Sequence, residues 1–240
     1  MNCNHFRPYI LLVAFALSTA CHAQNTLRDS LSLLNKQLEL RPTDTDLLLK
    51  RGGVEIALES WRSAIDTYTS VLKNDKRNPA ALFYRAYAYE QLGRFNFARR
   101  DYEDYLKTVP LNFEGMLCLA LLNHKDKHYT EAYDEINVLV EMHPDSTQLY
   151  VARANMEEDR SLIEPAIYDW GEVIARESTN AQHYIKRAQL YLQVNKRGEA
   201  ERDLDKAVSL GTPRNSLNYL YNQLKRKRLK AIDINKKHKK

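Results

Sequence analysis

A repeat period of thirty-four is the feature that most constrains how this chain can fold. Alanine returns at five positions separated by this constant interval, without an insertion between them. A second column of small residues has the same period. The two columns are Ala64, Ala98, Ala132, Ala166 and Ala200, and Gly52, Ala86, Ala120, Ala154 and Ala188. A fixed period of this length indicates a repeat architecture, in which each copy is one small unit that stacks on the next.

Each copy has the pattern of two paired helices. Apolar residues recur three or four positions apart, as in Leu82, Ala86 and Tyr89, which is the spacing of one helix face. The two small columns are twelve residues apart, so they fall on different helices and allow two backbones to approach closely. Gly93 stands in the expected turn, where a residue in the left-handed conformation can end the first helix. A third column holds the bulky residues Tyr68, Tyr102, Ile136, Trp170 and Leu204.

The second copy resembles the tetratricopeptide repeat family. The residues that carry the resemblance are Leu82, Ala86, Tyr89, Gly93, Ala98, Tyr102 and Pro110. It covers 45–214 as five units, which are 45–78, 79–112, 113–146, 147–180 and 181–214. It implies an all-α fold, a right-handed superhelical solenoid of five helix-turn-helix repeats with capping helices. The closing proline is absent where Lys76, Ser178 and Thr212 stand, which affects details of packing and not the fold.

The ends of the array have the pattern of caps. Residues 24–44 continue the period backward as half a repeat, so we expect a single N-terminal capping helix at about 26–40. At the other end, 215–224 begins a C-terminal capping helix. Its expected inner face consists of Leu217, Leu220, Tyr221 and Leu224.

The segment at 1–23 differs from the rest of the chain. Arg7 precedes an apolar run of about a dozen residues, and the small residue Ala23 follows it, which predicts a signal peptide at 1–23, cleaved after Ala23. A second interpretation remains open, because the residues from Ser18 to Cys21 resemble a lipobox and make Cys21 a candidate lipidation site. We therefore expect an exported protein, periplasmic or secreted, or lipid-anchored at Cys21. No other stretch is apolar and long enough to span a bilayer, so we expect no transmembrane segment in the mature chain.

An arginine column raises the question of whether the repeats hold a charged ligand. Arginine stands at 51, 85, 153 and 187, and Leu119 replaces it in the third unit. Because a buried charge without a partner is strongly destabilising, we interpret the column as structural ion pairs within repeats. The expected pairs are Arg85 with Asp101, Arg153 with Asp169, and Arg187 with Asp203. The pattern fails in the first unit, where Thr67 stands, and in the third, where Glu135 faces Leu119.

No catalytic pattern is visible, so we expect a protein that is not an enzyme and that uses no cofactor or metal. Phosphate-binding glycine loops and the G-x-S-x-G motif are absent. His124 and His128 have the spacing of two zinc ligands on one helix face, but His128 falls in a turn, and we interpret the pair as solvated. Cys118, the last cysteine of the expected mature chain, has no partner for an internal disulfide and is interpreted as a helix residue.

The resemblance implies a partner-binding surface on the first helix of each unit. In this family those helices line a concave face, and here that position is largely apolar and aromatic. The implied partner-binding residues are Leu49, Phe83, Tyr87, Leu117, Leu121, Val151, Asn155, Ile185 and Gln189. Such a surface suits an extended or helical peptide. An alternative is that Phe83 and Tyr87 only pack between neighbouring first helices.

The charge distribution opens a second functional hypothesis. Residues 225–240 hold nine lysines and arginines against one aspartate, whereas 24–224 has a net charge of −4. The first hypothesis is a protein–protein interaction scaffold or adaptor of the cell envelope, which binds a protein or peptide in the groove. The alternative is an electrostatic tether, in which the basic tail at 225–240 binds an anionic lipid or polysaccharide. We do not expect nucleic acid as a partner, because an exported protein meets little of it.

Overall fold

The computed structural model describes residues 17–224, with side chains from residue 24 onward. The basic tail and most of the expected signal peptide, 1–16, lie outside the described residues, as does the side chain of Cys21. All regular structure within 17–224 is helical, which confirms the all-α repeat fold. The chain divides into two compact units between Leu139 and Val140. Each unit is described by itself.

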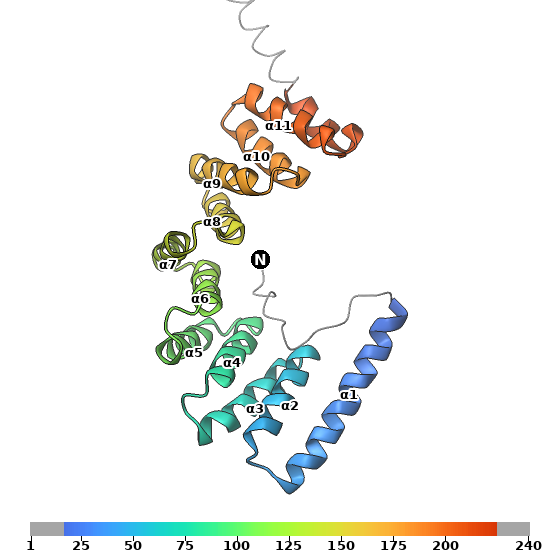
Figure 1. Ribbon diagram of the computed structural model, residues 1–240, viewed down its shortest axis with the longest axis vertical. Coiled ribbons are helices and arrows are strands. Elements are labelled where there is room, and N and C mark those ends of the chain that lie inside the picture. The colour runs from blue at the N-terminus through green and yellow to red at the C-terminus, as the bar shows by residue number, and fades with distance from the viewer. Residues whose placement is uncertain (1–16, 225–240) are drawn as a thin grey trace, which may run out of the picture. The chain divides into compact units, whose positions relative to one another are not determined.

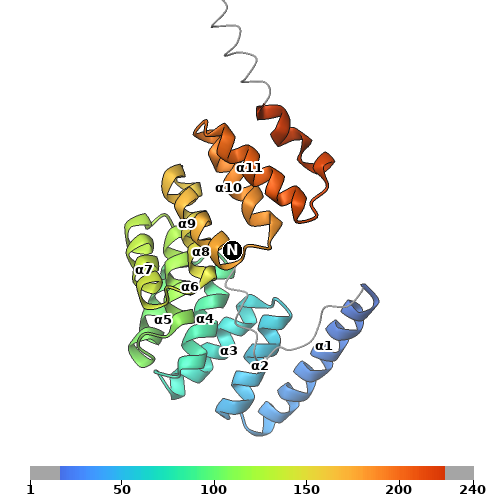
Figure 2. The same ribbon diagram turned by 45° about the horizontal axis from the view of Figure 1, so that its top comes forward.

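Consecutive helices pack side by side within each unit (Figures 1 and 2). The first unit holds α1 (Leu17–Leu40), α2 (Thr45–Ala57), α3 (Trp61–Asn74), α4 (Pro79–Gln91), α5 (Phe95–Thr108) and α6 (Phe113–Lys125). The division falls within α7 (Tyr129–Met142). The second unit holds α8 (Thr147–Asp159), α9 (Ile163–Arg176), α10 (Ala181–Gln193), α11 (Arg197–Ser209) and the 3₁₀ helix η1 (Arg214–Leu217), which leads into a helix at 218–224.

The first helices start at a repeated capping position. The side chains of Asp44, Asn78 and Asn112, which recur at the repeat period, accept hydrogen bonds from backbone N–H groups three residues later, at 2.9–3.1 Å. A side-chain acceptor at this point satisfies one of the N–H groups that a helix start leaves unpaired. The repeat period therefore also includes the capping residues that begin these first helices.

The turn between the two helices of each repeat contains a left-handed residue. Gly93 has φ of +70°, which confirms the helix-ending conformation expected from its place in the turn. The residues at the same position in the other repeats are Glu59, Lys127, Ser161 and Asn195, with φ between 56° and 64°. Only glycine, and to a lesser degree asparagine, adopts this conformation at little cost. Three of the five turns are therefore locally strained.

We expect Ser161→Gly to stabilise the fold by about 0.5–1 kcal/mol, because glycine relieves the left-handed strain at this exposed position. Gly93→Ala should have the opposite sign and cost about 1 kcal/mol, since it puts a Cβ into the same conformation. Urea denaturation followed by circular dichroism measures both free energies of unfolding. A loss of stability in Ser161→Gly would show that the turn is not strained there.

The residues of both small columns are buried. The five alanines of the first column have no exposed surface. In the first repeat a Cβ built on Gly52 would stand 2.5 Å from the ring of Tyr68, which is itself buried. Later repeats have alanine at the position of Gly52, so the first repeat has exchanged a methyl group for a closer ring contact.

Three bidentate ion pairs join the two helices of repeats two, four and five. In each, the arginine Nε and Nη2 donate to the two aspartate oxygens at 2.7–2.8 Å. The pairs are Arg85–Asp101, Arg153–Asp169 and Arg187–Asp203. Their aspartates are buried, and two parallel hydrogen bonds fix the helix register as well as the charge. This geometry is that of internal structural pairs.

In the first repeat the arginine, Arg51, is paired through different residues. Arg51 Nε donates to Thr67 Oγ1 at 3.1 Å, and the Thr67 hydroxyl donates to Glu55 Oε2 at 2.6 Å. Glu55 is thus the acidic partner, and burial raises the pKa of its carboxyl, although Thr67 and Arg51 oppose that shift. Glu55 lies four residues after Arg51, outside the sixteen-residue offset that predicts the other three pairs.

Both ends of the described chain are helical. The four residues expected on the inner face of the C-terminal cap, Leu217 to Leu224, are buried in one cluster with α10 and α11. At the other end α1 spans Leu17–Leu40, which includes the capping helix expected at about 26–40 of the mature chain. The helix therefore continues through the predicted cleavage site after Ala23, because 17–25 contains no proline or glycine that would end it.

Candidate partner-binding surface

The residues implied as partner-binding fall on five first helices but differ in accessibility. In the first unit Leu49, Tyr87 and Leu121 are partly buried on α2, α4 and α6. Phe83 and Leu117 are only 5% and 3% exposed. In the second unit the four remaining residues, Val151 and Asn155 on α8, and Ile185 and Gln189 on α10, are partly buried.

Phe83 is a core residue and not part of an accessible groove. Its ring makes edge contacts with Tyr84, Tyr102 and Tyr105, at centroid distances of 5.5, 5.6 and 5.2 Å. Aromatic pairs at this separation stabilise a core beyond their buried area. The alternative of packing between helices therefore applies to Phe83, and the burial of Leu117 excludes it from a partner surface in the same way.

Tyr87 is the aromatic residue that stays partly accessible on α4. Its ring meets Trp61 of α3 edge to face at 5.8 Å. One repeat earlier the same position is Gly53, and a Cβ added there would meet no atom within 4 Å. α2 therefore has no side chain at the position where α4 carries the aromatic ring of Tyr87.

Polar groups with unmet hydrogen bonds lie at the end of α4. Glu90 is 5% exposed, and one of its oxygens accepts from Lys125 Nζ at 3.3 Å. The Glu90 Oε2 acceptor and the Gln91 Nε2 donor are buried without a hydrogen-bond partner among the described residues. Burial raises the pKa of the Glu90 carboxyl, and Lys125 acts against that shift. Lys125 also lies 5.4 Å from the ring centre of Phe95.

The second unit has a more complete polar arrangement at the corresponding place. Glu158 is equivalent to Glu90 and accepts from Trp170 Nε1 at 2.7 Å. Lys186 Nζ stands 3.7 Å from the other oxygen of Glu158. This carboxylate therefore has partners for both oxygens, whereas Glu90 has a partner for one.

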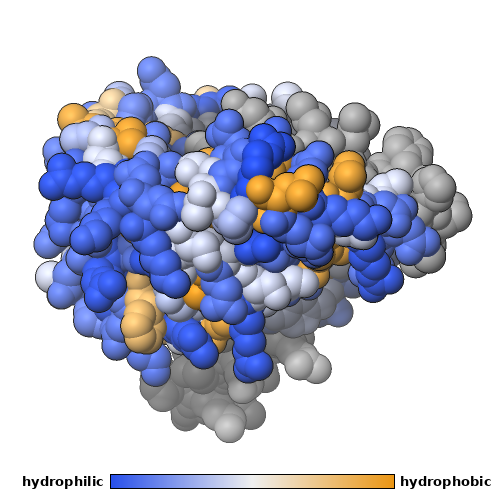
Figure 3. Space-filling model, turned by 90° about the horizontal axis from the view of Figure 1, so that it is seen from below, coloured by the Kyte–Doolittle hydropathy of each residue, from blue (hydrophilic) through white to orange (hydrophobic). Residues whose placement is uncertain are grey.

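Outside these positions the surface in view is mostly hydrophilic. Figure 3 shows hydrophobic residues only in small, separate patches among the described residues of that face. Scattered apolar side chains of this kind are normal on a soluble surface and do not mark a site by themselves.

The two histidines considered as metal ligands have other neighbours. The His124 ring contacts Tyr129 edge to face at 5.3 Å, and His128 lies 3.5 Å from Asp126 and 3.9 Å from Glu131. No group of three or more ligand side chains able to hold a metal occurs in the described part of the chain. Cys118 is buried.

Comparison with known families agrees with the helix pairs. A family model described as tetratricopeptide repeat matches residues 47–96, which span α2 to the start of α5. The crystal structure of a tetratricopeptide repeat protein from Parabacteroides merdae superposes with a TM-score of 0.60, covering 87% of this chain and 81% of that one at 22% identity. Residues 47–96 therefore match the tetratricopeptide repeat family, and the described helices share the fold of a tetratricopeptide repeat protein.

Other tetratricopeptide repeat structures show the same fold. YrrB, described as having an unusual peptide-binding site, matches with a TM-score of 0.58 over 74% of this chain and 92% of its own, at 16% identity. MamA from Desulfovibrio magneticus RS-1 matches with a TM-score of 0.62 over 69% and 94%, also at 16% identity. At such identities the likeness concerns the fold alone.

A curated relative matches only in part. It is the DnaJ homolog subfamily C member 7 homolog of Dictyostelium discoideum, 26% identical over 197 residues. The match covers 75% of this chain but 36% of the relative, so the chain spans about a third of that protein's length. Within 17–224, no helix is long and apolar enough to cross a membrane.

Proposed function

We propose that this chain is a non-enzymatic adaptor that binds a protein or peptide on its first helices. Protein binding is the general role of the repeat, and binding on the first helices is the specific proposal. In the first unit the surface would be formed by Leu49, Tyr87 and Leu121, with Glu90 and Gln91 beside them. Val151, Asn155, Ile185 and Gln189 would contribute from the second unit.

The observation that supports this proposal most is the pair of unmet polar groups on α4. A buried acceptor or donor without a partner costs about 1–3 kcal/mol, so a molecule that reached Glu90 Oε2 and Gln91 Nε2 and paired with both would be favoured. A peptide backbone supplies one N–H donor and one C=O acceptor per residue. Tyr87, in contact with Trp61, would add an aromatic contact at little entropic cost.

Site-specific photocrosslinking tests the proposal. A photoreactive phenylalanine at Tyr87 or Leu121 should crosslink a discrete partner in cells, and Glu90→Gln with Gln91→Ala should reduce that crosslink about tenfold, as expected for the loss of about 1.4 kcal/mol. The matched control is the same probe at Tyr168, an aromatic residue that is 63% exposed on α9, a second helix. Equal crosslinking at Tyr87 and Tyr168 would contradict binding on the first helices.

We also propose that the adaptor works outside the cytoplasm, at the cell envelope. The support is the sequence of the segment at 1–23 alone. Intact-mass analysis of the purified native protein tests it. A chain that begins at Gln24 supports export with cleavage after Ala23, a lipid-modified chain that begins at Cys21 supports anchoring, and an uncleaved chain contradicts both.

The alternative proposal is an electrostatic tether that uses the basic tail at 225–240. Its support is the charge of that segment. A tether predicts that association with anionic vesicles falls steeply with added salt and disappears when the chain stops at Leu224. If the truncated chain keeps its crosslink through Tyr87, the adaptor proposal is favoured over the tether.

A further inference from the structure

The third repeat lacks the arginine–aspartate ion pair found in repeats two, four and five. In repeats two, four and five a buried aspartate receives two hydrogen bonds from the arginine sixteen residues before it. The third repeat keeps the acid as Glu135 on α7, but the arginine position is the buried Leu119. Glu135 therefore has no arginine of its own repeat to neutralise it.

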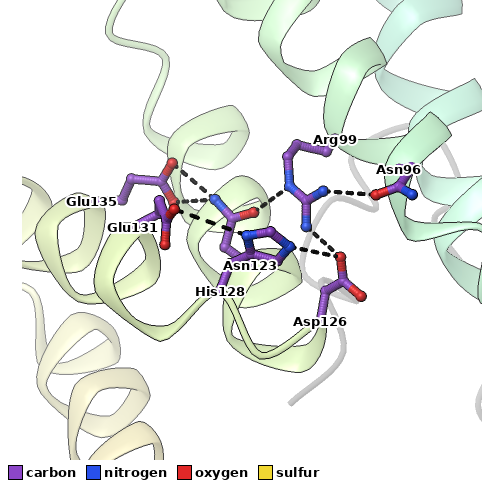
Figure 4. Close-up of polar contacts among 7 residues, drawn as sticks. All are labelled: Asn96, Arg99, Asn123, Asp126, His128, Glu131 and Glu135. Atoms are coloured by element: carbon purple, nitrogen blue, oxygen red, sulfur yellow. Dashed lines mark hydrogen bonds and ion pairs between the residues drawn. The ribbon is translucent and has the colours of Figure 1, made fainter.

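A neutral amide takes the place of the missing arginine (Figure 4). Asn123 on α6 is buried, and its Nδ2 donates to both oxygens of Glu135 at 3.0 Å. The Asn123 carbonyl oxygen in turn accepts from Arg99 Nε of α5 at 2.7 Å. The nearest guanidinium thus reaches Glu135 only through Asn123.

Arg99 is committed to other partners. Its Nη1 donates to Asn96 at 3.0 Å, and its Nη2 donates to Asp126 in an ion pair. The remaining charged groups that act on Glu135 are Glu103 of α5 and Glu131 of α7, and both are acidic. His128 lies beside Asp126 and Glu131, not beside Glu135.

This environment favours the protonated form of the Glu135 carboxyl. Burial is the main cause, and the charges of Glu103 and Glu131 add to it, while the Asn123 hydrogen bonds and Arg99 oppose it. Together they raise the pKa of Glu135 from an ordinary 4.5 to about 7.

We propose that protonation of Glu135 controls the contact between α6 and α7 in the third repeat. Loss of the proton from Glu135 loosens that contact. The protonated carboxyl fits a site that offers one neutral amide and no direct cation. The ionised carboxylate has no cation in direct contact and is destabilised by the charges of Glu103 and Glu131.

The direction of the effect follows from proton linkage. The folded state holds the Glu135 proton more tightly than the unfolded state, because its folded pKa lies above the ordinary value. The stabilisation from this group is complete below a pH of 4.5 and is lost as the pH rises to about 7. Above that value the contact of α7 with α6 should be at its weakest.

Two measurements on the intact chain test whether the contact between α6 and α7 depends on the Glu135 proton. The carboxyl carbon of Glu135, followed by NMR, should titrate with a midpoint near 7. Hydrogen exchange of the α7 amides, corrected for intrinsic rates, should show protection falling about tenfold between roughly pH 5.5 and roughly pH 8. A midpoint near 4.5, or protection of α7 that does not change with pH, would overturn the proposal.

Three variants distinguish the effect of the Glu135 proton on α7 from a general effect of pH. Glu135→Gln should abolish the pH dependence of α7 exchange, and so should Leu119→Arg combined with Glu135→Asp, which recreates the pair of repeats two, four and five. If the double variant does not fold, Glu135→Gln still decides the matter. His128→Gln should keep the dependence, because that imidazole does not contact Glu135; its loss in that variant would assign the effect to the histidine instead.

Discussion

Asp101→Asn is expected to lower the free energy of unfolding by about 2–4 kcal/mol, because it leaves a half-buried guanidinium without its counter-charge. Asp101 is 2% exposed and accepts two hydrogen bonds from Arg85, and Arg85 Nη1 donates a third to Thr69 of the preceding repeat at 3.1 Å. The substitution therefore weakens a contact that joins three helices. Urea denaturation followed by circular dichroism measures the change.

Two controls isolate the ion pair. Asp104→Asn removes a more exposed carboxylate that pairs with Lys107 and acts on Arg85 without a hydrogen bond, and it should cost much less than Asp101→Asn. Replacing Arg85 and Asp101 together by leucine should cost less than Asp101→Asn alone, because no buried charge is then left unpaired. Leu119 indicates that leucine is accepted in the arginine column. Photocrosslinking at Tyr87 should survive in Asp101→Asn; its loss in a folded variant would favour the ligand-binding interpretation of the arginines.

Trp170→Ala is expected to destabilise the second unit by about 3–5 kcal/mol, the usual cost of truncating a buried tryptophan. Trp170 is buried on α9, and its Nε1 donates to Glu158 of α8 at 2.7 Å. The change would leave a cavity and also deprive Glu158 of that hydrogen bond. Thermal and urea unfolding followed by circular dichroism measure the loss.

Trp170→Phe separates the two causes. Phenylalanine keeps most of the ring but lacks the donor, so this variant should lose only about 1–2 kcal/mol. If Trp170→Phe were as destabilising as Trp170→Ala, the hydrogen bond to Glu158 and not the packing would dominate at this position.

Much of the fold follows from the repeat period, because the period alone assigns residues to helix faces. A column that recurs with this period occupies the same place in each repeat, so the alanine column could be expected to lie at a helix contact. The sixteen-residue offset between Arg85 and Asp101 likewise placed the two side chains on facing helices, where they pair.

The candidate binding surface was less predictable, because burial depends on side chains from neighbouring helices. Phe83 and Tyr87 lie four residues apart on one helix, and the period treats them alike. Phe83 is enclosed by three tyrosines, whereas Tyr87 remains partly accessible beside Trp61. The repeat period does not predict how the rings of neighbouring helices pack around each of them.

The sequence by itself determined the helix pairs, their register and the acid–base pairs within repeats, since these depend on spacing along the chain. The tertiary structure alone decided how each exception is satisfied. Glu55 is the acid that Arg51 uses through Thr67, and Asn123 takes the place of an arginine at Glu135. In both cases the partner comes from outside the sixteen-residue offset, because any side chain of suitable length and chemistry that packing brings within hydrogen-bond distance can satisfy a buried polar group.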